Sequence, residues 1–289
     1  MERWPNFFIV GAPRAGTTSL WEYLKNTKGV YMSPIKQPKY FSVSVNDKIP
    51  LERPIRKKQD YLKLFKDAKD EVAIGESTPS YLWDPQTPKL IHSVVPDAKI
   101  IMILRDPVER AFSHYLLTFG LGMEQSSFSD AIQKALKAPP DYSGRIIVAG
   151  FYSESIKRYL KYFTREQIKI IIFEEFIKYT RSTVKDILEF LGVKAEVPEG
   201  IEKIHNPYTE SNNPLITTLK RSNTARQFVK NFLPRMAGRK IKKFFDKEVP
   251  KPKFLEKDRT FLEKLYYNDV KELENLLGRS LPWDIAKKP

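Results

Sequence analysis

The stretch of sequence that decides the fold lies near the start of the chain, where residues 7–20 read FFIVGAPRAGTTSL. It opens with four consecutive apolar residues, Phe7–Val10, which are typical of a buried strand. Two glycines and a proline follow, and apolar residues then recur at helical spacing at Leu20, Tyr23 and Leu24. The pattern therefore predicts a strand, a tight loop and a helix in succession.

This loop has the character of an anion-binding site. A loop between a strand and a helix aims backbone N–H groups and the positive end of the helix dipole at one point, which most often binds phosphate. Gly11 and Gly16 keep the Gly-x-x-x-x-Gly frame of nucleotide-phosphate loops, but Thr17 stands where those loops carry a lysine. Arg14 is the only cation in this loop sequence. An ordinary strand-to-helix turn with a surface arginine is the alternative interpretation, because glycine, proline and threonine are common in turns.

The composition narrows the class of protein and of partner. The 289 residues suit one large α/β domain, and we expect a single domain over residues 1–289. Lysine and arginine number 50 against 35 acidic residues, and the net charge of +15 favours an anionic partner such as a nucleotide, nucleic acid, acidic glycan or anionic membrane. The chain has no cysteine, and we see neither a secretory signal nor an apolar run of membrane-spanning length. We therefore expect a cytoplasmic protein.

Strands and helices are expected to alternate along the chain. We expect strands at four apolar runs: Phe7–Val10, Val72–Ile74, Ile100–Leu104 and Ile168–Phe173. We expect helices between them at Thr17–Asn26, Gln59–Phe65, Pro88–Val95, Pro107–Thr118, Phe128–Leu136 and Ser153–Tyr162. Alternation of this kind predicts a three-layer α/β/α domain with a central, mostly parallel sheet. Ligands of such sheets bind beyond the carboxyl ends of the strands, so the residues that follow each strand are candidates for the site.

The last third of the chain combines two expected helices with an irregular basic segment. The spacing of apolar residues predicts helices over Thr183–Gly192 and over residues 257–278, each ended by a glycine. Residues 193–256 have the least regular pattern, and we interpret them as loops and short helices added to the same domain. Their basic run from Arg235 to Lys243 could rest on an anionic membrane or line a cleft for an acidic glycan, although a solvated helix face is the more common use of such a run.

A second anion signal follows the third expected strand. Arg105 stands where a nucleoside triphosphatase usually has an aspartate that helps to hold magnesium. A guanidinium at the carboxyl end of a strand is a two-pronged ligand for an oxyanion and not for a metal. Pro107 suits the first turn of the next helix, and Ser113 lies about two turns further on, where its hydroxyl could reach the same anion. The alternative is a surface pair of Arg105 with Asp106 or Glu109.

Two anion sites at neighbouring strand ends suggest a nucleotide with phosphates on both sides of its ribose, and here the sequence resembles a known family. It is similar to the sulfotransferases that use 3′-phosphoadenosine 5′-phosphosulfate (PAPS). The loop from Gly11 to Ser19 resembles their 5′-phosphosulfate loop in its Pro-Arg-x-Gly-Thr-Thr form, and residues 105–113 resemble their 3′-phosphate motif. Supporting similarity lies in four further segments: KQPKYF at 36–41, GESTPSY at 75–81, FEEF at 173–176 and LLGRSLPW at 276–283.

The resemblance implies a role for individual residues. Those that would hold the 5′-phosphosulfate follow one another in the first loop: Arg14, Ala15, Gly16, Thr17, Thr18 and Ser19. Arg105 and Ser113 would bind the 3′-phosphate, Phe173 would lie near the adenine, and Arg221 would close over the 3′-phosphate. The transferred sulfuryl group carries less charge than a phosphoryl group, so fixed N–H groups and the Arg14 cation could stabilise the leaving phosphate without a metal ion.

The acceptor group needs a base, and here the sequence departs from the family pattern. Many relatives have Lys-Glu-Pro, in which the glutamate is the base that the resemblance implies, whereas this chain has Lys36-Gln37-Pro38. A neutral amide cannot take a proton at ordinary pH. Glu76, expected at the carboxyl end of the second strand, is our preferred base, and the alternative is a buried carboxylate that holds Arg14 or Lys36 in place. Lys36 could steer the sulfuryl group or an anionic acceptor, or it could be a solvated loop charge.

The sequence therefore predicts sulfuryl transfer from PAPS, with release of adenosine 3′,5′-bisphosphate (PAP) and with no metal, to a glycan, lipid or small metabolite. A hydroxyl acceptor is preferred over an amine. One rival is a phosphate-loop nucleotide kinase, which requires a lysine at position 17 and a metal-binding aspartate near position 105. Another is a PAPS- or PAP-binding module without activity, which Gln37 suggests. A nucleic-acid binder is not expected, because the sequence shows no helix-turn-helix, zinc or RNA-platform pattern.

Overall fold

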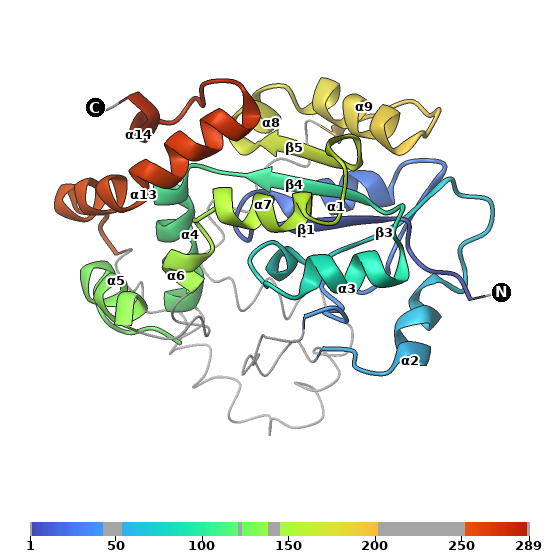
Figure 1. The fold of residues 1–289 in the computed structure, drawn as a ribbon, viewed down its shortest axis with the longest axis horizontal. Coiled ribbons are helices and arrows are strands. Elements are labelled where there is room, and N and C mark those ends of the chain that lie inside the picture. The colour runs from blue at the N-terminus through green and yellow to red at the C-terminus, as the bar shows by residue number, and fades with distance from the viewer. Residues whose placement is uncertain (1, 43–53, 121–122, 138–144, 202–251, 288–289) are drawn as a thin grey trace, which may run out of the picture.

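A five-stranded parallel sheet forms the centre of the protein. The structure is a computed structural model that describes residues 2–42, 54–120, 123–137, 145–201 and 252–287 (Figure 1). The sheet has the strand order β2-β3-β1-β4-β5, and every neighbouring pair in it is parallel. Its strands are β1 (Phe7–Gly11), β2 (Val30–Met32), β3 (Ala73–Ser77), β4 (Lys99–Leu104) and β5 (Ile168–Ile172). The predicted α/β class is confirmed.

One of these strands was not predicted, and one predicted strand ends too late. Strand β2 is only three residues long, and its middle residue, Tyr31, is half-buried, so its pattern is too short to separate from a loop. It pairs with β3, with Val30 opposite Ala73. The last predicted strand included Phe173, but this residue begins a helix instead.

The helices expected within the described residues are present. Three short ones in this part of the chain, α6, α8 and α14, each of four to six residues, were not predicted. The helices up to β5 are α1 (Thr17–Lys25), α2 (Lys58–Leu62), α3 (Thr87–Val94), α4 (Pro107–Gly120), α5 (Phe128–Lys137), α6 (Arg145–Val148) and α7 (Ser153–Leu160). The later ones are α8 (Phe173–Lys178), α9 (Thr180–Leu191), α13 (Glu256–Leu277) and α14 (Asp284–Lys287). Short 3-10 turns lie at η1 (Lys63–Phe65), η2 (Pro79–Tyr81) and η3 (Arg165–Gln167).

Helices cover both faces of the sheet. The connection from β1 to β2 through α1 runs to one side of β1, whereas the connection from β3 to β4 through α3 crosses to the other side. Right-handed crossovers in opposite directions place their helices on opposite faces. Figure 1 shows α3 and α7 in front of the sheet and α1 behind it, and α7 also contacts α3 and α13. This is the predicted three-layer arrangement.

Strand β1 is the centre of the core and positions the first loop. Phe7–Val10 are 0 % exposed, because β1 lies between β3 and β4 and is covered on both faces. Since all strands are parallel, the residues that follow β1 and β4 emerge at one edge of the sheet, with the carboxyl end of β3 beside them. That edge is where parallel α/β sheets bind ligands.

Part of the predicted organisation lies outside the described residues. These include Arg221, the basic run from Arg235 to Lys243 and most of the irregular segment 193–256. The single domain over residues 1–289 therefore stays a prediction. In the part of the chain that the structure describes, we find no helix with both the length and the hydrophobicity needed to cross a membrane.

The packing of β3 on β1 yields a stability prediction. A Cβ atom on Gly75 would lie 2.3 Å from Cζ of Phe7, far inside van der Waals contact with a fully buried ring. We expect Gly75→Ala to lower the free energy of unfolding by about 3 kcal/mol, the upper part of the usual range for overpacking. Urea denaturation of the variant and the wild type measures this loss.

The matched control for Gly75→Ala is the same substitution at Gly278, which ends α13. Gly278 has φ 65°, in the left-handed region, and a Cβ there would meet nothing within 4 Å. Gly278→Ala should therefore lower the free energy of unfolding by only about 1 kcal/mol, the cost of placing an alanine in the left-handed conformation. Equal losses for the two variants would contradict the steric explanation.

Candidate functional site

The two predicted anion loops touch each other at the carboxyl edge of the sheet. Arg105, directly after β4, donates a hydrogen bond from Nη1 to the carbonyl oxygen of Arg14, after β1, at 3.2 Å. Arg14 in turn donates from Nε to Oγ of Ser113, inside α4, at 3.2 Å. These contacts form because β1 and β4 are neighbours in the sheet. The structure thus brings together two guanidinium groups and one hydroxyl that the sequence analysis had assigned to two phosphate sites.

The first loop presents its backbone toward the site. Gly16 precedes α1 with φ 86°, and it has no side chain with which to cap the N–H groups of the first helical turn. The side chains of Ala15 and Thr17 are buried, at 0 % and 4 % exposure, whereas Thr18 is exposed and Ser19 is half-buried. Ala15 and Thr17 could therefore contact an anion only through their N–H groups, and Thr18 also through its hydroxyl.

Phe173 joins the two loops. A Cβ atom on Gly16 would lie 3.0 Å from Cδ2 and Cε2 of the Phe173 ring, so the loop passes close against that ring. The guanidinium carbon of Arg105 lies 5.0 Å from the centroid of the same ring, within the range of a cation–π interaction. Phe173 occupies this place because it begins α8 at the carboxyl end of β5. Glycine is required at position 16 both for its positive φ and for this close approach.

The turn after β4 is fixed by a helix cap. Oδ1 of Asp106 accepts hydrogen bonds from the N–H groups of Val108 at 2.8 Å and Glu109 at 3.2 Å, the first turn of α4. Burial raises the pKa of Asp106 to about 6, while these two N–H groups act in the opposite direction. Glu109 pairs with Arg259 at 2.6 Å. The alternative in which Arg105 forms a surface pair with Asp106 or Glu109 is therefore not the arrangement in the structure.

Two further contacts hold this turn in place. Tyr152 donates its hydroxyl to the carbonyl oxygen of Arg105 at 2.8 Å. Glu174 accepts the N–H of Asp106 at 3.1 Å on one oxygen and the indole N–H of Trp283 at 2.9 Å on the other. The backbone that carries the Arg105 guanidinium is thus tied to α7, α8 and the end of the chain.

A third segment, residues 36–41, lies against the first loop. Lys36 donates from Nζ to Oγ1 of Thr18 at 2.7 Å, which places its ammonium group at the start of α1. The next residue, Gln37, has φ 61° and donates its N–H to the carbonyl oxygen of Ser77, at the end of β3, at 2.9 Å. The structure therefore brings Lys36 to the first loop.

Glu76 does not occupy the position expected for a base. Its side chain is 0 % exposed, and its two oxygens accept hydrogen bonds from the hydroxyls of Tyr61 at 2.8 Å, Tyr81 at 2.9 Å and Thr78 at 2.5 Å. Burial raises its pKa to about 7, and the three hydroxyls oppose that rise. The donors to Glu76 are hydroxyl groups, and among the described residues neither Arg14 nor Lys36 is one of its hydrogen-bond partners. In this geometry the carboxylate is enclosed by protein, and its role as the base stays a prediction.

Sequence reasoning missed the partners of Glu76 and the cap formed by Asp106. Asp106 before Pro107 is the signature of a helix start, and this signal was available. Thr78 and Tyr81 follow Glu76 at short spacing, but only the tight turn η2 after β3 directs both hydroxyls at one carboxylate. Tyr61 comes from α2, and no local pattern connects it to β3.

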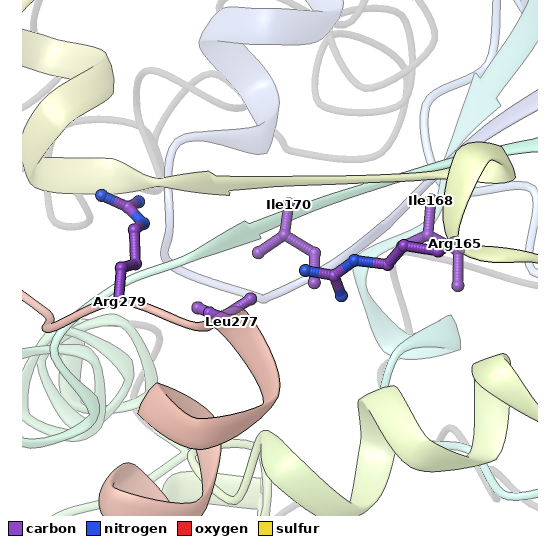
Figure 2. A pocket seen from close by; sticks show the side chains of 5 residues that line it. All are labelled: Arg165, Ile168, Ile170, Leu277 and Arg279. Carbon is purple, nitrogen blue, oxygen red and sulfur yellow. The ribbon is translucent and has the colours of Figure 1, made fainter.

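Two cavities in the described part of the chain lie away from this site. One of about 130 Å³ is lined by Arg165, Ile168, Ile170, Leu277 and Arg279. Figure 2 shows Arg279 at one side of this pocket and Arg165 toward the other, with Ile170 and Leu277 between them and Ile168 beside Arg165. Arg279 is bound to both oxygens of Glu175, at 2.6 and 2.8 Å. None of the predicted site residues lines this pocket.

The sequence is similar to those of known sulfotransferases. A family model described as "Sulfotransferase domain" matches residues 5–267. The chain is similar to mouse carbohydrate sulfotransferase 15, at 26% identity over 281 residues that cover 77% of this chain and 47% of that protein. It is also similar to human heparan sulfate glucosamine 3-O-sulfotransferase 6, at 27% identity over 197 residues that cover 68% and 55% of the two chains. The chain spans about half the length of these curated relatives.

Solved structures with the same fold include two sulfotransferases. The sulfotransferase from Alicyclobacillus acidocaldarius superposes with a TM-score of 0.73 at 28% identity, covering 99% of this chain and 100% of that chain. A mouse sulfotransferase complexed with PAP superposes with a TM-score of 0.54 at 16% identity, covering 96% of this chain and 88% of that chain. The second likeness concerns the fold alone.

The buried carboxyl of Glu76 gives a prediction about pH. Its pKa of about 7 lies above the 4.5 of an exposed glutamate, so the folded chain binds this proton more tightly than the unfolded chain does. The stabilisation from that proton is complete below about pH 4.5 and is lost as the pH rises through about 7. The glutamine side chain of Glu76→Gln does not bind a proton in this pH range. The stability of the wild type relative to this variant, from urea unfolding, should therefore fall between about pH 5 and about pH 8, and a constant difference would contradict the raised pKa.

Proposed function

Because this chain belongs to the sulfotransferase family, we propose that it transfers the sulfuryl group of PAPS to a hydroxyl group of a carbohydrate acceptor. The observation that carries the proposal is the direct contact between the loops after β1 and β4, which joins Arg14, Arg105 and Ser113. Two guanidinium groups at one sheet edge form a positive region that attracts an anion. A nucleotide with phosphates on both sides of its ribose supplies two such anions.

The donor would be held mainly by groups already in place. Arg14 and the N–H groups at the start of α1 would bind the 5′-phosphosulfate, while Arg105 and Ser113 would bind the 3′-phosphate. Phe173, between the two loops, would lie beside the adenine. Arg221 lies outside the described residues, and the proposal that it closes over the 3′-phosphate rests on the resemblance alone. The net charge of +15 favours approach of this anionic donor.

The reaction exchanges one sulfur–oxygen bond for another. The acceptor oxygen forms a bond to sulfur while the bond between sulfur and the bridging oxygen of the 5′-phosphate breaks. PAP leaves with the electron pair of that bond, so negative charge develops on the bridging oxygen. Arg14 and fixed N–H groups would stabilise this charge, and Lys36 would do the same for the sulfuryl oxygens. The metal-free reaction stays a prediction.

The carbohydrate acceptor is proposed from the names of the relatives. Mouse carbohydrate sulfotransferase 15 and human heparan sulfate glucosamine 3-O-sulfotransferase 6 are both named for transfer to sugars. An acidic glycan would also suit the net positive charge of this chain. Transfer of radiolabelled sulfate from PAPS to desulfated heparin and desulfated chondroitin tests this class. Labelling of simple phenols or lipids in place of both glycans would contradict it.

A second candidate function, binding of PAPS or PAP without transfer, is favoured by the state of two candidate bases, Gln37 and Glu76. The acceptor must lose a proton, Gln37 is a neutral amide, and Glu76 is enclosed. Gln37→Glu would restore a carboxylate next to Lys36. If the chain is an enzyme, the wild type transfers sulfate. The variant then raises the rate by no more than about a hundredfold, the lower end of the usual contribution of a general base. A wild type that is inactive on all acceptors, beside an active variant, would favour the binding function.

Arg105 provides the test of the nucleotide. We expect Arg105→Ala to weaken PAP binding by about 1.5–3 kcal/mol more than it weakens AMP binding, the scale of hydrogen bonds to a charged group, because AMP lacks the 3′-phosphate. Isothermal titration calorimetry with both nucleotides measures the two affinities. Arg165→Ala, which removes an exposed arginine beside β5, is the control for the loss of one positive charge. Equal weakening of PAP and AMP by Arg105→Ala would contradict its assignment.

Arg14 provides the test of the transfer step. Since charge on the bridging oxygen develops only during transfer, Arg14→Ala should lower kcat by about tenfold to a thousandfold while the affinity for PAP changes by less. Single-turnover transfer from radiolabelled PAPS, combined with calorimetry, separates the two effects. A loss of PAP affinity as large as the loss of rate would contradict the role of Arg14 at the leaving group.

A further inference from the structure

Two of the hydroxyls that bind Glu76 also accept hydrogen bonds from the segment that carries Lys36. Thr78 donates its hydroxyl to Glu76 and accepts the N–H of Lys39 on the same oxygen, at 3.4 Å. Tyr81 donates to Glu76 and accepts the N–H of Phe41, at 3.1 Å. The carboxylate is therefore connected to two backbone groups of residues 36–41, each time through one hydroxyl.

The direction of the hydrogen bonds that run from the backbone through Thr78 and Tyr81 to Glu76 depends on the carboxylate. A hydroxyl has one proton to donate, and a backbone N–H can only donate. An oxygen that accepts from the N–H of Lys39 or Phe41 can therefore give its own proton to Glu76, provided that Glu76 offers a lone pair. Burial raises the pKa of Tyr81 well above that of an exposed tyrosine, so its hydroxyl keeps that proton.

Residues 36–41 need such an anchor, because their backbone is strained. Gln37 has φ 61° and Lys39 has φ 55°, both in the left-handed region that is unfavourable for residues with a side chain. Surrounding contacts must hold such residues in place. The side chain of Lys39 is only 2 % exposed, so the segment is also packed tightly against the core.

These hydrogen bonds lie in enclosed, aromatic surroundings. The ring of Tyr40 stacks on that of Tyr61 with centroids 4.3 Å apart, and Phe41 packs edge-on against Tyr61 at 5.6 Å and Tyr81 at 6.1 Å. Tyr61, Tyr81 and Glu76 are fully buried beneath this aromatic layer. Hydrogen bonds in an enclosed, water-free environment are worth more than exposed ones, and a broken one leaves a polar group without water.

We propose that Glu76 is a positioning residue whose carboxylate, acting through Thr78 and Tyr81, holds residues 36–41 in the conformation that directs Lys36 to the phosphosulfate loop. In this role Glu76 touches neither donor nor acceptor. The structural part of the proposal stands on its own contacts. Only the consequence for PAPS rests on the proposed function, because Lys36 reaches Thr18 of that loop.

Amide hydrogen exchange of the full chain tests the anchor directly. Glu76→Gln, Thr78→Val and Tyr81→Phe each break at least one of the two chains, so exchange of peptides covering residues 36–41 should accelerate by about tenfold or more in all three variants. Thr78→Val and Tyr81→Phe leave the carboxylate in place, which separates positioning from proton transfer by Glu76. They also keep the test available if Glu76→Gln does not fold.

Tyr61→Phe is the matched control. It removes a hydroxyl from the same oxygen of Glu76 that Tyr81 contacts, but that hydroxyl binds no backbone group of residues 36–41 among the hydrogen bonds of the described chain. Exchange of residues 36–41 should therefore stay near the wild-type rate. Equal acceleration in Tyr61→Phe, or unchanged exchange in both Thr78→Val and Tyr81→Phe, would overturn the proposal.

Calorimetry with PAPS and PAP provides the second readout. If Lys36 contacts the sulfuryl group, Thr78→Val and Tyr81→Phe should weaken PAPS about fivefold or more relative to PAP, which lacks that group, while Tyr61→Phe should leave the ratio unchanged. An unchanged ratio in Thr78→Val and Tyr81→Phe would overturn the link to Lys36. Failure of wild-type protein to bind PAP would instead count against the proposed function, and the exchange experiment would still decide whether Glu76 anchors the segment.

Discussion

The hydrogen bond from the Arg105 guanidinium to the carbonyl oxygen of Arg14 is the contact on which the site depends. It joins the loops after β1 and β4, which are far apart in sequence and adjacent in the sheet. The same guanidinium lies over Phe173, whose ring packs against Gly16, so one cation fixes both loops relative to α8. Its own backbone is held by Tyr152. The spacing of the two cationic groups is therefore set before any anion arrives, which lowers the ordering cost of binding.

Glu76 shows how function and stability oppose each other at this edge. Removing a carboxylate from water is unfavourable, and burial accordingly raises its pKa to about 7. Yet the ionised form accepts from Tyr61, Thr78 and Tyr81 together without a proton of its own that needs an acceptor, while two of those hydroxyls accept from the backbone. The protein thus carries a group whose charge is unfavourable for the fold and favourable for the order of residues 36–41. Such a conflict is typical of residues that serve a site and not the core.

The sequence was most informative where the signal is local. The strand-loop-helix unit around Gly16 and the helix that begins at Pro107 were predicted because apolar periodicity and turn residues act over a few positions. Strand β2 was missed because three residues carry too little periodicity. The environment of Glu76 could not be predicted, since Tyr61 reaches it from another element and a carboxylate at a strand end has the same sequence pattern whether it is open or enclosed. Contacts between elements decide such cases, and one sequence does not display them.

The departure from the family pattern at Gln37 concerns a side chain and not the frame that holds it. The backbone N–H of Gln37 binds the carbonyl oxygen of Ser77, and its positive φ is maintained by contacts on both sides of it. These interactions do not involve the amide group of the side chain. Strained residues persist only where the surrounding structure maintains them, so this frame is held by its backbone contacts whichever side chain stands at position 37. The departure at position 37 therefore leaves intact the backbone frame that places Lys36 beside Thr18.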